Sequence, residues 1–443
     1  MKLRRLGTAM ILIFLASSLV GAATLTVTSP NPVIAADGQC SLIEAIINAN
    51  DDTQTHADCS AGSGADTIVL NGITYTLTEP YDGFNGLPDI TSPITIEGND
   101  ATIARDTRSD KAFRIFEVSG VLQGDEVDGD LTLYNTTVTG GYVQADGGGI
   151  YSRGGPLTLI DVTVTGNTTI LGGVVSDGDG GGVLTWGLAM IINSTISDNN
   201  SPRLGGGVAG DEFIIIDSTI SDNTGDGIWG RETTLINSTI SGNEGTGIWG
   251  DDSVISTNST ISGNTFGGIE MSEAAVFVLI NSTVVGNMGG LYITAPEYGD
   301  VEVLNLFNNI IANNGFDCSI EGIPVSSGNL IQDGSCGSEF PPGTDPMLGL
   351  LKDNGGPTET HAVLAGSPAI DGGGEVCLDA DGQPLTTDQR GQSRPVDGNG
   401  DGSNACDIGA FEIQKVVIDL PPIVIPPIPN TDFTGSSSGS GCF

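Results

Sequence analysis

The amino-acid sequence predicts an all-β protein that folds as a right-handed parallel β-helix, a solenoid in which short strands stack coil upon coil. Three observations lead to this fold class. A unit of the form Asn-Ser-Thr-Ile-Ser-x-Asn recurs through the middle of the chain, a β-branched run precedes each copy, and a Gly-rich turn follows it. A unit that recurs at bounded intervals is typical of repeat architectures, and β-branched runs favour strands.

The repeat unit has the pattern of a strand between two bends. Clear copies begin at Asn193, Asp217, Asn237 and Asn258, and a looser copy begins at Asn281. Polar and apolar residues alternate within each copy, which is the period of a strand and not of a helix. The copy, the run before it and the Gly-rich segment after it supply three short strands. We therefore expect triangular coils.

The Asn that ends each unit predicts how neighbouring coils are held together. At a bend between strands an Asn side chain can bond to backbone groups and tolerates left-handed angles. In coils that stack at about 4.8 Å, equivalent Asn side chains can also bond to one another. The predicted ladder consists of Asn199, Asn223, Asn243, Asn264 and Asn287. The Asn-Ser-Thr triplets also match glycosylation acceptors, but a packed coil favours the structural interpretation.

Residues 1–23 have the composition of a secretory signal peptide. Basic residues precede an apolar run that is too short to span a membrane, and the small residues Gly21, Ala22 and Ala23 follow. No second apolar stretch of spanning length follows, so we expect no transmembrane segment in the mature chain. The sequence predicts a bacterial protein that is secreted or held at the cell surface.

The chain is strongly acidic, with a formal net charge of −41. This charge argues against nucleic acid or an anionic membrane as partner, because phosphate binding relies on basic residues. It also disfavours anionic substrates unless metal ions intervene. The carboxylates have two interpretations: a solvated coat that keeps an exported protein in solution, or ligands for Ca²⁺.

The seven cysteines suggest a set of local disulfides. Pairing is expected in an exported chain. The spacing groups Cys40 with Cys59, Cys318 with Cys336, and Cys377 with Cys406, which leaves Cys442 near the C-terminus. Each pair would close a loop within one segment of the chain.

Residues 24–80 predict an N-terminal cap and the first coils. Ser41 and Glu44 have the spacing of a capping box at the start of a short helix. The stretch Asp37-Gly-Gln-Cys-Ser-Leu-Ile-Glu-Ala-Ile46, together with Gly64-Ala-Asp-Thr-Ile68, resembles the bacterial CSLREA domain. Members of that family typically carry Arg where this chain has Ile43.

Residues 331–412 predict a disulfide-stapled C-terminal cap that resembles the choice-of-anchor Q domain of exported bacterial proteins. The motifs that carry this resemblance are Asp345-Pro-Met-Leu-Gly349, Asp353-Asn-Gly-Gly-Pro-Thr358, Gly366-Ser-Pro-Ala-Ile-Asp371, Asp388-Gln-Arg-Gly391 and Asp407-Ile-Gly-Ala-Phe-Glu412. The coils between the caps, residues 81–330, look like the pectin-lyase-like β-helix and the repeats of polymorphic outer membrane proteins. Residues 413–443 form a Pro-rich and then Gly/Ser-rich tail. The resemblances imply an exported, surface-associated protein and carry no established activity.

Residues for polysaccharide chemistry are sparse in the coils. A lyase needs Ca²⁺ held by carboxylates and a basic residue, and Arg153, Arg203 and Arg231 are scattered without a neighbouring Lys. A hydrolase needs facing carboxylates, and Asp251-Asp252 resembles the paired Asp of polygalacturonases but lacks their His and Arg-x-Lys motifs. No catalytic residue is predicted.

One loop has a metal-binding pattern. Asp397, Asn399 and Asp401 place oxygen ligands at alternate positions before a Gly, as calcium loops do, but the closing Glu is absent. This loop is the candidate for a structural Ca²⁺ ion, and the alternative is a plain Asp/Asn/Gly turn.

The sequence therefore favours a non-catalytic β-helix that is adhesin-like, glycan-binding or structural. Its expected partner is an extracellular glycan or another surface macromolecule. The alternative is a Ca²⁺-dependent polysaccharide lyase or a glycoside hydrolase of the pectin-lyase-like fold.

Overall fold

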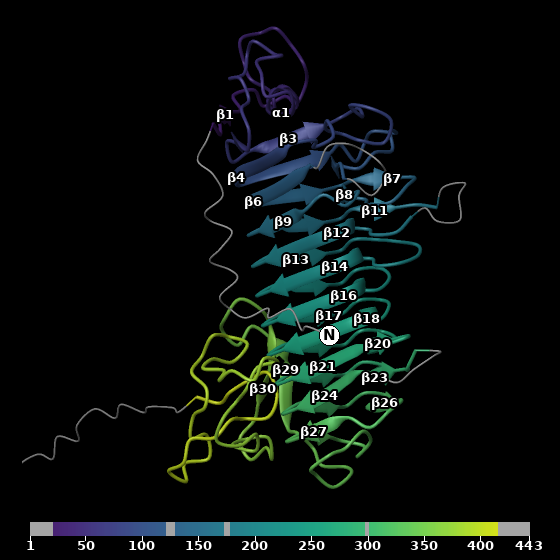
Figure 1. Ribbon diagram of the computed structural model, residues 1–443, viewed down its shortest axis with the longest axis vertical. Coiled ribbons are helices and arrows are strands. Elements are labelled where there is room, and N and C mark those ends of the chain that lie inside the picture. The colour runs from purple at the N-terminus through teal and green to yellow at the C-terminus, as the bar shows by residue number, and fades with distance from the viewer. Residues whose placement is uncertain (1–20, 121–128, 172–177, 297–300, 415–443) are drawn as a thin grey trace, which may run out of the picture.

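The computed structural model describes residues 21–120, 129–171, 178–296 and 301–414. These residues wind a 26-stranded sheet into a tall parallel β-helix (Figure 1). Residues 1–20 of the predicted signal peptide, the tail from residue 415 and Cys442 lie outside the described residues. Among the described residues, no helix is both long enough and apolar enough to cross a membrane.

Most coils contribute a strand to each of three columns, so the predicted triangular coil is confirmed. Column A contains β5 (Phe116–Val118), β8 (Ile150–Ser152), β20 (Gly267–Met271), β23 (Gly289–Ile293) and β26 (Cys318–Ile320). Column B contains β1 (Thr24–Thr26), β2 (Asp66–Val69), β9 (Leu157–Ile160), β21 (Val276–Ile280), β24 (Val303–Phe307) and β27 (Val325–Ser327). Column C contains β3 (Thr74–Leu77), β10 (Thr163–Thr165), β13 (Thr195–Ser197), β15 (Thr219–Ser221), β17 (Thr239–Ser241), β19 (Thr260–Ser262), β22 (Thr283–Val285), β25 (Ile310–Ala312) and β28 (Leu330–Ile331).

Longer strands run through two columns without a break. Columns A and B share β12 (Val183–Ile192), β14 (Val208–Ile216), β16 (Ile228–Ile236) and β18 (Ile248–Thr257). Columns B and C share β4 (Pro93–Arg105) and β6 (Asp130–Thr139). The short strands β7 (Tyr142–Val143) and β11 (Thr168–Thr169) pair beside the coils, and β29 (Leu348–Lys352) pairs antiparallel with β30 (Thr360–Val363).

The core is a set of aligned apolar stacks inside the coils. In column A, Val183, Val208, Ile228 and Ile248 are paired in register from strand to strand. Each of these side chains is fully buried. Because successive residues of a strand point to opposite faces, the residue after each of them points outward. The inward register therefore also fixes which side chains face solvent in column A.

The polar residues at the two ends of the repeat unit have different structural roles. The first residue of each unit has a left-handed backbone, with φ of 46° at Asn193, 51° at Asp217 and 50° at Asn258. Asn and Asp tolerate this conformation better than other residues with a side chain. The last Asn is buried and its amide bonds to the next coil, so it fixes the vertical register.

The Asn ladder runs from coil to coil as a chain of paired hydrogen bonds. The Asn199 Nδ2 atom donates to Asn223 Oδ1 at 3.1 Å and to the Val164 carbonyl at 2.9 Å. The ladder bonds that continue it join Asn223 to Asn243, Asn243 to Asn264, and Asn264 to Asn287. A second ladder, which the sequence interpretation missed, uses the Ser at the second position of each unit. In it the Ser194 amide donates to Ser218 Oγ at 3.0 Å.

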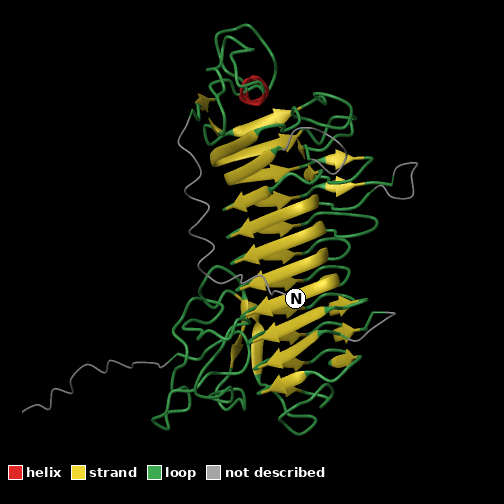
Figure 2. Ribbon diagram, viewed as in Figure 1, coloured by secondary structure: helices red, strands yellow, loops and turns green. Residues whose placement is uncertain are grey.

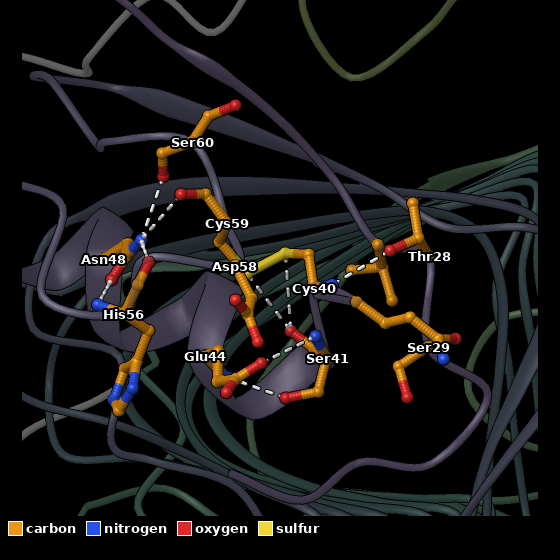
Figure 3. The surroundings of a disulfide bond; sticks show 12 residues. Thr28, Ser29, Cys40, Ser41, Glu44, Asn48, His56, Asp58, Cys59 and Ser60 are labelled. Carbon is orange, nitrogen blue, oxygen red and sulfur yellow. Dashed lines mark hydrogen bonds between the residues drawn. A yellow bond between two sulfur atoms is a disulfide. The ribbon is translucent and has the colours of Figure 1, made fainter. Parts of the chain in front are cut away.

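The N-terminal cap covers the first coil with the one helix of the described residues, α1 (Leu42–Asn50) (Figure 2). The Glu44 amide donates to Ser41 Oγ at 3.3 Å, and the Ser41 amide donates to Glu44 Oε2 at 3.0 Å, which completes the predicted capping box. The disulfide between Cys40 and Cys59 lies beside this helix start (Figure 3).

The C-terminal segment lies along the flank of the last coils, over column C (Figure 1). His361 Nε2 bonds with Ser262 Oγ at 2.8 Å, and Arg394 Nη1 donates to Asn258 Oδ1 at 3.1 Å. A small apolar cluster joins Phe411 to Ile310 of the coils. The remaining disulfides join Cys318 to Cys336 and Cys377 to Cys406. The segment therefore covers one side of the β-helix and leaves column A uncovered.

The ladder predicts a sharp difference between two neighbouring Asn residues. Asn199 is 1% exposed, and its Oδ1 atom also accepts from the Asn167 amide at 3.0 Å. Asn199→Ala leaves several buried polar groups unpaired and should lower the free energy of unfolding by about 3 kcal/mol. Asn200→Ala, at the exposed next position, should change it by less than about 0.5 kcal/mol. Urea denaturation midpoints measure both, and equal effects would contradict a ladder that fixes the register.

Candidate functional site

The basic residues singled out in the coils do not come together. Arg203 forms an ion pair with Asp179 at 3.5 Å. The guanidinium of Arg231 ion-pairs with the carboxylate of Glu232 at 2.9 Å and lies 3.7 Å from that of Asp252. Only Arg153 belongs to a cleft. The structure therefore places these three basic residues apart from one another.

The predicted calcium loop is folded as a series of Asx turns. The Asp397 Oδ1 atom accepts from the Gly400 amide at 2.7 Å, and Asn399 Oδ1 accepts from the Asp401 amide at 2.8 Å. Within the described ranges, no three or more His, Cys, Asp and Glu side chains are grouped so that they could hold a metal ion. Calcium binding at this loop stays a prediction.

A cleft of about 330 Å³ lies at the N-terminal end of column A. Its walls come from the segment 82–89, from β5 and the residues before it, and from residues 145–153. Ile90 pairs in parallel with Val118 of β5, so Asp89 occupies the outward position one rung before Glu117. Glu117 in turn pairs in register with Tyr151 of β8. The cleft is thus the first part of the outward face of column A.

A buried carboxylate at the base of the cleft is held by two guanidinium groups. Glu117 is 1% exposed and forms ion pairs with Arg114 and Arg153. The Arg114 guanidinium also lies 4.7 Å from the centroid of the Tyr151 ring. Removal of Glu117 would leave the buried Arg114 guanidinium without its carboxylate partner, so the set depends on this carboxylate.

A second carboxyl group in the cleft, that of Asp89, has a raised pKa. Burial raises the pKa of Asp89 to about 6, and the nearby charges of Glu117 and Asp82 add to this effect. The Asp89 Oδ1 atom accepts from Asn85 Nδ2 at 2.6 Å. Burial, followed by the charge of Glu117, also raises the pKa of Asp82. The cleft therefore holds a carboxyl group with a raised pKa beside the ion-paired carboxylate of Glu117.

Beyond the cleft, aromatic side chains follow one another down the outward side of column A. Register pairs Tyr151 with Leu184, Ala209 with Trp229, Trp229 with Trp249, and Glu270 with Tyr292. Trp186 and Trp229 pack over the buried Leu184 and Ala209. We call the aromatic members of this surface the aromatic face: Tyr151, Trp186, Trp229, Trp249 and Tyr292. The three Trp residues of the chain all belong to it.

The sequence interpretation missed this face although a signal for it exists. The segments Gly227-Ile-Trp-Gly230 and Gly247-Ile-Trp-Gly250 repeat the same pattern after Gly-rich turns. With the Ile inward, the period of a strand places the following Trp outward. The cleft had no comparable signal, because Asp89 and Arg114 lie outside the repeat units.

The raised pKa of Asp89 predicts a pH-dependent stability difference between the native chain and Asp89→Asn. The folded-state pKa lies above the ordinary value of 3.8, so this contribution to stability is complete below about pH 4 and is lost as pH rises through about 6. Between pH 4 and 7 the native chain should lose about 1–2 kcal/mol relative to the variant, after allowance for solvent screening at this half-buried group. Thermal unfolding across this range measures the difference. Glu244→Gln, on an exposed turn, serves as control, and parallel curves for Asp89→Asn and the native chain would contradict the prediction.

Comparisons with known proteins find one family model and several similar solved structures. Residues 148–316 match the family model described as "Right handed beta helix region". The structure of the pectate lyase Pel9A is similar with a TM-score of 0.51, at 15% identity over 89% of this chain and 96% of that one. The complex of XylC with xylose has a TM-score of 0.37, at 12% identity over 80% of this chain and 67% of that one. The A-module of the Azotobacter vinelandii mannuronan C-5 epimerase AlgE6 has a TM-score of 0.30, at 15% identity over 65% of this chain and 94% of that one.

The comparison with curated proteins gives no match. The matched family residues lie within the coils, so the resemblance of the two caps to the CSLREA and choice-of-anchor Q domains stays a prediction. The predicted fold class is confirmed: the chain folds as a right-handed parallel β-helix.

Proposed function

We propose that this protein is an exported, non-catalytic β-helix that binds an uncharged polysaccharide along its aromatic face. The observation that carries the proposal is the register that stacks Trp229 directly on Trp249 at an outward position of column A. An aromatic ring offers a flat apolar surface with little conformational entropy to lose, which suits the apolar faces of sugar rings. Stacked coils repeat that surface at about 4.8 Å along the axis.

The charges around the aromatic face favour a neutral glycan. The carboxylates of Asp211, Glu232 and Asp252 surround the guanidinium of Arg231, two residues beyond Trp229. Carboxylates accept hydrogen bonds from sugar hydroxyls, whereas they repel the carboxylates of a polyuronate. The net charge of −41 also repels anionic polysaccharides over longer distances. Nucleic acid is disfavoured for the same reason.

An exported location fits the disulfides. The structure pairs six cysteines in three bonds, and such bonds persist in oxidising compartments. A face of partly exposed aromatic residues on a rigid, elongated body suits attachment to an extracellular glycan. An adhesin-like role at a cell surface follows from the same features.

Hydrolysis of a glycosidic bond in the cleft is the second candidate. A carboxyl group with a raised pKa beside an ionised carboxylate is the pair that such a reaction uses. Glu117, however, is neutralised by two guanidinium groups, which weakens it as a base or nucleophile. Assays for new reducing ends, with the native chain and Asp89→Asn, separate this candidate from binding alone.

Binding on the aromatic face predicts a direct optical signal. Because all three Trp residues lie there, titration with neutral polysaccharides should change the intrinsic Trp fluorescence. Trp249→Ala should weaken the affinity about tenfold, the value expected for the loss of one stacked ring.

Tyr134→Ala is the matched control, because Tyr134 is a half-buried aromatic residue of β6 in columns B and C. The affinity of the Tyr134→Ala variant for the polysaccharide should equal that of the native protein. An unchanged fluorescence with linear xylans, glucans and mannans alike would refute neutral-glycan binding on this face.

A further inference from the structure

The aromatic face runs into the cleft without a break. Glu117 and Tyr151 line the cleft and are also in-register members of the outward side of column A. Tyr151 and Trp186 belong to the same packed group. A chain that lies along the aromatic face toward the N-terminus therefore meets the cleft next.

The N-terminal cap is joined to the rung at the far end of the cleft. Asn50, the last residue of α1, donates from Nδ2 to the Asp89 carbonyl at 2.7 Å and accepts from the Thr91 amide at 2.9 Å. Among the described residues, no rung of column A precedes the one that carries Asp89. The outward side of column A therefore begins at the cleft.

Arg114 lines the cleft with a side chain that is only partly satisfied by the described residues. It is 3% exposed, and its Nε atom has no hydrogen-bond partner among them. A buried donor without a partner costs free energy, which is unusual for a side chain with a purely structural role.

The other groups of the cleft complete the recognition pattern of a sugar. Asp89 and Glu117 offer acceptors for hydroxyl groups, and the rings of Tyr151 and Phe84 offer apolar surfaces. The volume of about 330 Å³ leaves room for one sugar ring. A free anion would meet four carboxylates there: Asp82, Asp89, Glu117 and Asp146.

We propose that this cleft binds the terminal, uncharged sugar residue of a polysaccharide whose following residues lie along the aromatic face. The proposal rests on the glycan binding proposed above and adds that the protein recognises chain ends. From Asp89 to Trp249 the outward side of column A spans six rungs, or about 29 Å at about 4.8 Å per rung. The cleft and the aromatic face therefore bind the same polysaccharide chain.

Calorimetric titration with linear xylan, glucan and mannan fragments of defined length tests this proposal. Recognition of ends predicts one protein per chain whatever its length. A stoichiometry that grows in proportion to chain length would overturn the proposal and leave binding on the aromatic face intact. If no fragment binds and the Trp fluorescence is also unchanged, the proposed function itself fails.

Variants separate the two parts of the site. Phe84→Ala removes a ring that is 52% exposed, so its effect on folding should be small. Phe84→Ala and Asp89→Asn should each weaken the binding of short fragments about tenfold. Trp249→Ala should weaken only the fragments long enough to reach it. The exposed Glu244→Gln is the control for Asp89→Asn. Unchanged binding of short fragments by both cleft variants would place the chain end elsewhere.

Fragments with chemically blocked ends provide a further check. Conversion of the reducing end to an alditol and substitution of the opposite end each alter one end only. One of the two modifications should reduce the affinity of the native protein for the fragment about tenfold. The same modification should change the affinity of the Asp89→Asn variant only slightly. Equal affinity for both blocked forms and the unmodified fragment would contradict recognition of a chain end.

Discussion

The structure depends on hydrogen bonds that hold each coil to the next at its bends. A strand of three residues, such as β13 or β15, makes few ladder bonds of its own and could slip against its neighbour. The buried amide of Asn199 prevents this, since it bonds both to Asn223 and to the backbone of the preceding coil. The Ser ladder adds a second line of bonds at the other end of the same strand. A shift by one residue would break both lines together.

The same register determines the outward surface. Column A keeps Val208, Ile228 and Ile248 in one inward stack, and this forces Ala209, Trp229 and Trp249 into one outward line. The core and the aromatic face are therefore two consequences of one alignment. Repetition of a short unit is therefore enough to align aromatic rings in a regular row.

The sequence predicted those parts of the molecule that repeat. The period of the Asn-Ser-Thr-Ile-Ser unit was enough to predict three-strand coils and the position of Asn199 at a bend. The capping box was readable because Ser41 and Glu44 interact over three residues. The cleft was not readable, because Asp89, Arg114 and Tyr151 come together only after two irregular turns bring their rungs side by side. The contact between His361 and Ser262 could not be predicted from a local sequence pattern either, because the two residues are 99 positions apart.

The placement of the C-terminal segment bears on which surface can bind a ligand. It covers column C over the last coils, where the outward Thr and Ser side chains bond to Gln389 and His361. In Figure 1 this segment and the labels of β20, β23 and β26 lie on opposite sides of the β-helix. Coverage of column C hides a polar face of small side chains that offers little to a sugar ring. The C-terminal segment does not cover column A, which carries the rings and begins at the cleft (Figure 1). The chain thus uses its irregular C-terminal part to stabilise one face and its repeats to present another.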